Sequence, residues 1–220
     1  EVVLEATASG VTVEILARNL PRFLPGVGPA NGVLGDSLNE ICNQVASLDR
    51  SFLAIQGPPG TGKTWTGARI VRHLVESGMR VGITAFSHKA IDNLLEETVS
   101  VFEETGDLSS LSAVRKGYPP ADGASPAVFY ATTNKQCAKP EYNVVAGTTW
   151  LFSHKDLRTN PVDVLVIDEA GQLGLADAVA AARWATSVVL LGDPQQLPQV
   201  AQASHPAGSG ASVLEHILDD

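Results

Sequence analysis

The sequence predicts an α/β fold with a doubly wound, mainly parallel sheet and helices on both of its faces. Short apolar segments typical of buried strands alternate along the chain with segments that have the periodicity of amphipathic helices. In addition, a glycine-rich turn at residues 57–64 directly follows the first apolar segment. A strand that leads through such a turn into a helix is a recurrent unit of parallel sheets.

The expected strands consist mainly of Val, Ile, Leu and Ala, which suits strands covered on both faces. They span residues 51–56, 80–85, 142–146, 162–167 and 187–191. Ser37 and Glu40 form a capping-box pattern, which predicts a helix over about 38–48. A second helix should follow the glycine-rich turn and end at Gly78, and a third should carry apolar residues over 91–102.

Two stretches differ from this alternation. Residues 1–35 contain β-prone pieces at 2–4 and 11–15, followed by several prolines and glycines. We expect them to be the end of a preceding domain and a linker, so that the main domain covers residues 36–220. Residues 105–140 are irregular and rich in Gly and Pro, which predicts an insertion or loops.

Composition narrows the class of protein. Apolar residues make up 44% of the chain, but no segment approaches the ~20 apolar residues that span a bilayer. Cys42 and Cys137 have no metal-ligand spacing, so buried thiols in a reducing cytoplasm are expected, with a disulfide as the alternative. The chain begins at Glu1 and its only methionine is Met79, which favours a piece of a longer protein.

The charge balance argues against a surface that binds nucleic acid by bulk electrostatics. The formal net charge is −9, and the basic residues form no block; Arg115 and Lys116 are an isolated pair. A polynucleotide would therefore depend on local backbone and hydroxyl contacts.

The glycine-rich turn has the order of a Walker A phosphate-binding loop. It consists of Gly57, Pro58, Pro59, Gly60, Thr61, Gly62, Lys63 and Thr64. Its glycines let backbone N–H groups approach phosphate oxygens, and the following helix adds its positive end. Lys63 can reach the β- and γ-phosphates, and the Thr64 hydroxyl can ligate Mg²⁺. ATP with Mg²⁺ is the expected ligand; the alternative is a glycine-rich turn before a helix.

Acidic and amide side chains follow two other strands. Asp168 and Glu169 end the strand at 162–167, the Walker B arrangement, in which Asp168 holds Mg²⁺ and Glu169 deprotonates the attacking water. The alternative is a pair of acids that caps the next helix. Gln196 follows the strand at 187–191 and could place its amide near the terminal phosphate.

Polar and aromatic residues follow the remaining strands. Ser87, His88 and Lys89 come after the strand at 80–85, and Thr149 and Trp150 come after the strand at 142–146. Hydroxyls and aromatic rings at successive strand ends could contact a single nucleic-acid strand. The alternatives are a solvated or helix-capping His88 and a Trp150 packed in the core.

Together these segments resemble superfamily 1 helicases. The resemblance rests on residues 57–64, 84–95, 168–172 and 192–198, in that order, and covers about residues 36–218. The Asp-Glu-x-x-Gln form is most similar to the branch that contains senataxin and the nonsense-mediated-decay helicase, whose members move 5′→3′. The resemblance implies a RecA-like P-loop NTPase.

The resemblance also implies roles for individual residues. Lys63 and Thr64 would bind phosphates and Mg²⁺, Asp168 would bind Mg²⁺, and Glu169 would activate water. Gln172 and Gln196 would couple the state of the γ-phosphate to movement. Ser87, Lys89 and Thr149 would contact the nucleic-acid strand. Two features depart from the family. Leu38-Asn39 is not followed by an in-register glutamine, because Gln44 lies too far along, which leaves adenine recognition open. The second RecA-like domain, with its arginine fingers, has no counterpart in these residues.

We therefore expect the first motor domain of an ATP-dependent helicase, partnered by single-stranded DNA or RNA and by a second RecA-like domain of the parent chain. The alternative is a nucleotide-gated switch or binding module that unwinds nothing. A transporter ATPase is disfavoured because residues 152–158 lack a Ser-Gly-Gly signature, and no nuclease motif is visible.

Overall fold

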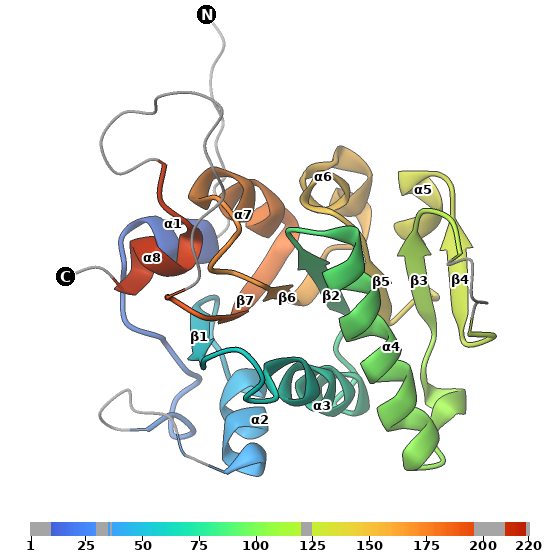
Figure 1. The fold of residues 1–220 in the computed structure, drawn as a ribbon, viewed down its shortest axis with the longest axis horizontal. Helices are drawn as coiled ribbons and strands as arrows, with labels where there is room; N and C mark the ends of the chain where they lie inside the picture. Colours follow the sequence, from blue (N-terminus) through green and yellow to red (C-terminus); the bar gives the residue numbers. More distant parts are fainter. Residues whose placement is uncertain (1–9, 30–34, 36, 120–124, 196–209, 219–220) are drawn as a thin grey trace, which may run out of the picture.

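The chain forms an α/β domain around one parallel sheet, seen here in a computed structural model that describes residues 10–29, 35, 37–119, 125–195 and 210–218. In this part of the chain the sheet has seven strands in the order β1-β7-β6-β2-β5-β3-β4. Every neighbouring pair is parallel. The predicted doubly wound P-loop NTPase architecture is confirmed, because helices cover both faces of this sheet (Figure 1).

The strands are β1 Phe52–Gln56, β2 Val81–Ala85, β3 Ala113–Lys116, β4 Val128–Ala131, β5 Val144–Ala146, β6 Val162–Asp168 and β7 Ala185–Gly192. The α-helices are α1 Gly10–Leu16, α2 Leu38–Ala46, α3 Lys63–Glu76, α4 His88–Glu104, α5 Asn134–Cys137, α6 Thr149–Ser153, α7 Leu175–Ala181 and α8 Val213–Leu218. Three short 3₁₀ helices are η1 Leu108–Ser110, η2 Lys155–Thr159 and η3 Ala182–Trp184.

Alternation along the strands divides the core into two layers. On β6, Val164 and Val166 belong to the layer under α2, α3 and α4, whereas Leu165 and Ile167 belong to the layer under α1, α5, α6, α7 and α8. All four side chains are buried, which explains the apolar run from Val164 to Ile167. The same alternation directs Asp168, the last residue of β6, toward the layer that contains α3.

Local signals account for the helices that flank the phosphate loop. Ser37 and Glu40 form the predicted capping box at the start of α2, each side chain bonded to the other residue's backbone N–H. Helix α3 ends just before Gly78, whose φ of 78° lies in the left-handed region that favours glycine. Helix α3 packs closely on the sheet at Gly67, where an added Cβ would lie 2.5 Å from Leu191.

Two sequence expectations were wrong. The β-prone residues 11–15 form helix α1, because Val11 and Ile15 lie one turn apart and are completely buried in the layer that includes β7. The stretch 105–140 is not only loops: it contributes β3 and β4, which extend the sheet at one edge. The domain boundary at residue 36 stays a prediction.

Both cysteines are buried free thiols. Cys42 lies in the layer under α2 and Cys137 in the layer on the opposite face of the sheet, so a disulfide between them does not form in this structure. Burial raises the pKa of both thiols, that of Cys137 to about 11. Among the helices of the described residues, none has the length and apolar character that a membrane crossing requires.

Candidate active site

The phosphate loop connects β1 to α3. Gly60 and Gly62 have φ values of 80° and 81°, which residues with a Cβ rarely adopt, and Gly62 immediately precedes the first turn of α3. At Gly57 an added Cβ would lie 2.5 Å from Oγ1 of Thr61. Gly60 and Gly62 are thus required by the shape of the loop, which leaves backbone N–H groups at the helix N-terminus for an anion.

Lys63, the first residue of α3, folds its side chain back over this loop. Its Nζ donates to the carbonyl oxygens of Gly57 at 2.5 Å and Pro58 at 2.9 Å. Thr61 closes the loop from the other side, since its Oγ1 donates to the Pro58 carbonyl at 2.7 Å. The ammonium group therefore lies where it can bind a phosphate held by the loop.

Asp168 lies against the start of α3, as the alternation along β6 requires. Its Oδ2 accepts a hydrogen bond from Oγ1 of Thr64 at 3.3 Å, although the two residues are 104 positions apart. Only 5% of Asp168 is exposed, and this burial raises the pKa of its carboxyl group above the ordinary value. A divalent cation fits this pair, because a hydroxyl and a buried carboxylate offer oxygen ligands without a competing cation in contact.

These two residues are the protein groups that could hold Mg²⁺. The described residues contain no cluster of three or more His, Cys, Asp or Glu that could bind a metal by itself. Magnesium usually keeps several waters and takes further ligands from substrate phosphates, so one hydroxyl and one carboxylate are sufficient. The arrangement therefore fits a nucleotide-bound ion and not a permanently caged one.

Glu169 occupies an unusual backbone conformation. Its φ of 54° is left-handed, which costs a residue with a Cβ about 1–2 kcal/mol. Two hydrogen bonds hold it there: its N–H donates to Oδ1 of Asp168 at 2.9 Å, and its carbonyl accepts from the N–H of Gln172 at 2.8 Å. Burial, and secondarily the Asp168 charge, raise the pKa of the Glu169 carboxyl group, which suits a proton acceptor near neutral pH.

The end of β7 joins the phosphate loop to residues 168–172, here called the acidic turn. The carbonyl of Gly192 accepts from the N–H of Gly57 at 3.2 Å, and the carbonyl of Leu191 accepts from the N–H of Ala170 at 2.9 Å. At Gly171 the two backbones lie so close together that an added Cβ would be 2.4 Å from the carbonyl oxygen of Asp193. Gln172 lies on the acidic turn as predicted, whereas Gln196 lies outside the described residues.

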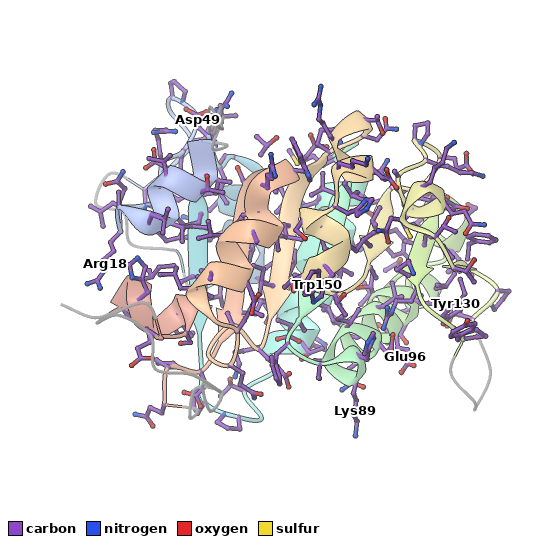
Figure 2. All side chains as sticks on the ribbon, turned by 90° about the horizontal axis from the view of Figure 1, so that it is seen from above. Arg18, Asp49, Lys89, Glu96, Tyr130 and Trp150 are labelled. Carbon is purple, nitrogen blue, oxygen red and sulfur yellow. The ribbon has the colours of Figure 1, made fainter. Side chains whose placement is uncertain are left out.

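The predicted strand-contacting residues separate into two groups. Ser87 caps α4, its Oγ accepting from the N–H of Ala90 at 3.0 Å, and also reaches Oε2 of Glu169 at 3.5 Å. His88 and Lys89 begin α4 and are exposed, and Figure 2 shows Lys89 projecting outward. Ser87 therefore belongs with the acidic turn, whereas Lys89 projects outward and His88 is exposed to solvent.

Thr149 is the first residue of α6 and is partly exposed. The next residue, Trp150, is 82% exposed, so the alternative that this ring packs in the core is wrong. Phe86, which directly follows β2, is 39% exposed. Both rings are accessible to solvent, where a base could stack on them.

Arg115 on β3 was also missed. It is 3% exposed, and its Nε donates to Oδ1 of Asp92 at 2.6 Å, while Nη2 lies 3.0 Å from Nδ1 of His88. In the sequence it belongs to an isolated basic pair with Lys116. The only available signal was its place directly after the apolar pair Ala113 and Val114.

Known proteins resemble this chain over most of its length. A family model described as an AAA domain matches residues 34–209. The DNA replication ATP-dependent helicase/nuclease DNA2 of Saccharomyces cerevisiae is 30% identical over 167 residues, which cover 71% of this chain and 11% of that protein. The Xenopus laevis protein of the same name is 31% identical over 171 residues, covering 75% and 16%.

The chain thus spans only a small part of these relatives. The SWI2/SNF2 ATPase core domain of Sulfolobus solfataricus aligns with 78% of this chain and 35% of its own, at 14% identity and a TM-score of 0.45. That likeness is weak, and the assignment rests on the family model, which includes the phosphate loop and the acidic turn. The chain belongs to the AAA domain family and is distantly similar to the DNA2 helicase/nucleases.

Proposed function

We propose that residues 36–220 form the first motor domain of a superfamily 1 helicase or translocase, which binds and hydrolyses ATP. The observation that carries this proposal is the convergence of two distant motifs: Lys63 and Thr64 lie on the phosphate loop, and Thr64 is bonded to Asp168, next to Glu169. The similar DNA2 proteins are named ATP-dependent helicase/nucleases, which supports the same reaction.

Each of these side chains has a distinct role in the proposed reaction. Lys63 binds the β- and γ-phosphate oxygens, and Thr64 and Asp168 hold Mg²⁺. Bound Mg²⁺ would offset negative charge on the phosphate oxygens. Glu169 orients a water molecule and accepts its proton. Gln172, on the turn that follows Glu169, responds to the presence of the terminal phosphate, and we assign the same role to Gln196.

A single nucleic-acid strand is the proposed track. Exposed His88 and Lys89 at the start of α4, and Thr149 and Trp150 at the start of α6, offer donors, a positive charge and an aromatic face. The net charge of −9 means that such local contacts, and not bulk attraction, would provide the affinity. Ser87 contributes through Glu169, linking the track to hydrolysis.

We further propose that a second RecA-like domain of the parent chain completes the active site. The similar DNA2 proteins are much longer, since this chain spans 11% and 16% of two of them. An arginine finger supplied from outside contributes about 10³–10⁵ in rate, so the 220-residue chain alone should hydrolyse ATP slowly.

A nucleotide-gated switch is the second candidate, and the acidic balance of the chain favours it. In this case hydrolysis would time the association with a protein partner. The exposed aromatic and basic groups at the starts of α4 and α6 favour the helicase.

The discriminating experiment measures ATPase turnover of the full-length protein that carries these residues, with single-stranded DNA, with single-stranded RNA and with neither. Stimulation by one polymer would support the translocase and identify its track. Turnover that is unchanged by either polymer would contradict the helicase proposal and favour the nucleotide-gated switch. A Glu169→Gln variant controls for contaminating ATPases, since its stimulated turnover should be lost.

A further inference from the structure

A buried arginine lies beneath the proposed nucleic-acid surface. Arg115 is the only lysine or arginine among the buried residues of the described chain. A buried charge is costly unless hydrogen bonds satisfy it, and the two side chains that contact Arg115 both belong to α4. None of the roles proposed above uses this residue.

The guanidinium group of Arg115 contacts two residues on the same side of α4. Nε donates to Oδ1 of Asp92 at 2.6 Å, and Nη2 contacts Nδ1 of His88 at 3.0 Å. These residues are four positions apart, so they lie one above the other on the helix. Nη1 also donates to the carbonyl oxygen of Lys116. The planar fork is thereby fixed in three directions, which a lysine could not reproduce.

This geometry determines how His88 is protonated. A guanidinium group can only donate hydrogen bonds, so Nδ1 of His88 must accept and carries no proton. In the neutral ring the proton is therefore on Nε2. No hydrogen bond among the described residues uses Nε2, and His88 is exposed. The result is a donor of fixed orientation on the outside of the molecule.

We propose that Arg115 is a positioning residue that presents Nε2–H of His88 to an acceptor oxygen of the bound strand, such as a phosphate oxygen. This deepens the proposed function and rests on it. A ring held in this way offers a hydrogen bond of fixed direction to the strand. The adjacent Ser87 bonds to Glu169, so a strand held at His88 lies one residue from a group of the hydrolytic site.

Two substitutions of His88 separate its two ring nitrogens. His88→Gln keeps a donor near the position of Nε2, whereas His88→Asn keeps a group near Nδ1 and removes the outward donor. Binding of a fluorescent single-stranded oligonucleotide to the full-length protein is measured for both. We expect His88→Asn to weaken binding about tenfold and His88→Gln to retain most of it, as for one hydrogen bond to a charged acceptor.

The role of Arg115 is tested by a double-mutant cycle. Arg115→Lys alone should weaken strand binding, and in its presence the further effect of His88→Asn should shrink, because the ring is no longer held. Arg80→Lys is the matched control: Arg80 is partly buried and its guanidinium donates to the carbonyls of Cys137 and Lys139, but at the opposite end of β2. It should leave strand binding unchanged.

Nitrogen NMR tests the tautomer without any strand and without a variant of Arg115. At about pH 8, where a free imidazole is neutral, a ¹H–¹⁵N correlation spectrum of the histidine rings should show Nδ1 of His88 without a proton. The signal is assigned by its absence from His88→Gln. A proton on Nδ1 would overturn the proposal.

The outcomes separate the two levels of inference. If the unaltered protein binds no strand, the proposed function fails, and the strand contact of His88 fails with it. If the protein binds a strand but His88→Asn and His88→Gln behave like the unaltered protein, only the role of His88 and Arg115 is overturned.

Discussion

Replacing Gly171 by alanine should separate the acidic turn from the end of β7. The added Cβ would lie 2.4 Å from the carbonyl oxygen of Asp193, whereas carbon–oxygen contacts are normally about 3.3–3.6 Å. The added Cβ and this oxygen must therefore move apart by about 1 Å. The obstacle is a backbone atom, so no side-chain rotation can provide it, and the turn that holds Glu169 must move.

Both stability and hydrolysis should respond. Overpacking a well-packed site costs about 1–3 kcal/mol, which for a domain of this size lowers the melting temperature by roughly 2–12 °C. A displacement of about 1 Å at a catalytic group can reduce the rate about 100-fold. Thermal unfolding and single-turnover ATP hydrolysis of the full-length protein measure the two effects.

Gly174→Ala is the matched control on the same loop. Gly174 has a φ of −60°, and its added Cβ would lie 3.7 Å from Oδ2 of Asp177, an ordinary contact. This variant should differ from the unaltered protein by less than about 0.5 kcal/mol. If Gly171→Ala were equally harmless in both assays, the close approach of the two segments would not matter for hydrolysis.

Three further predictions concern single side chains. Ser87→Ala should cost about 0.5–2 kcal/mol through loss of the helix cap and should also slow hydrolysis, whereas Thr133→Ala, which removes the cap of α5, should affect stability alone. Asp168→Asn should raise the free energy of unfolding near pH 7 in the absence of Mg²⁺. Burial raises the folded-state pKa of Asp168, so the charged carboxylate destabilises the fold at high pH, and the gain should vanish in urea titrations below pH 3.8. Cys137 should resist a thiol reagent at about pH 8 until the protein unfolds, because its pKa is about 11; rapid labelling of the native protein would contradict its burial.

The central strands and the phosphate site could be predicted because their signals are local. β1, β2, β6 and β7 are mainly apolar, and the glycine pattern at residues 57–64 determines its own backbone shape. The capping box of α2 is likewise contained in four residues. Such features need no knowledge of the neighbouring elements.

The errors arose where tertiary contacts decide the structure. Val11, Thr12 and Val13 are β-branched and favour a strand, but burial of Val11 and Ile15 on one side selects helix α1. β3 and β4 are only four residues each and are separated by glycines and prolines. They form because β5 offers a free edge to β3, which the sequence of either strand does not reveal.

The site shows the same division. Lys63, Thr64, Asp168 and Glu169 were identified from motifs, and strand order brings Thr64 and Asp168 into contact. Two other contacts depend on the order of the strands in the sheet. Ser87 reaches Glu169 because β2 lies beside β6. Arg115 reaches His88 because β3 is separated from β2 only by β5. Neither pair has a signature in the sequence.

The decisive measurement compares ATP binding and hydrolysis by the full-length protein with those of its Glu169→Gln variant. Glu169 lies beside the residues assigned to phosphate and Mg²⁺ but is not itself assigned to either ligand. The variant should therefore bind Mg²⁺–ATP with an affinity within about threefold of the unaltered protein. It should hydrolyse ATP at least about 100-fold more slowly. Lys63→Ala, in contrast, should lose binding itself. Undiminished hydrolysis by Glu169→Gln would contradict the role of this turn as the hydrolytic centre.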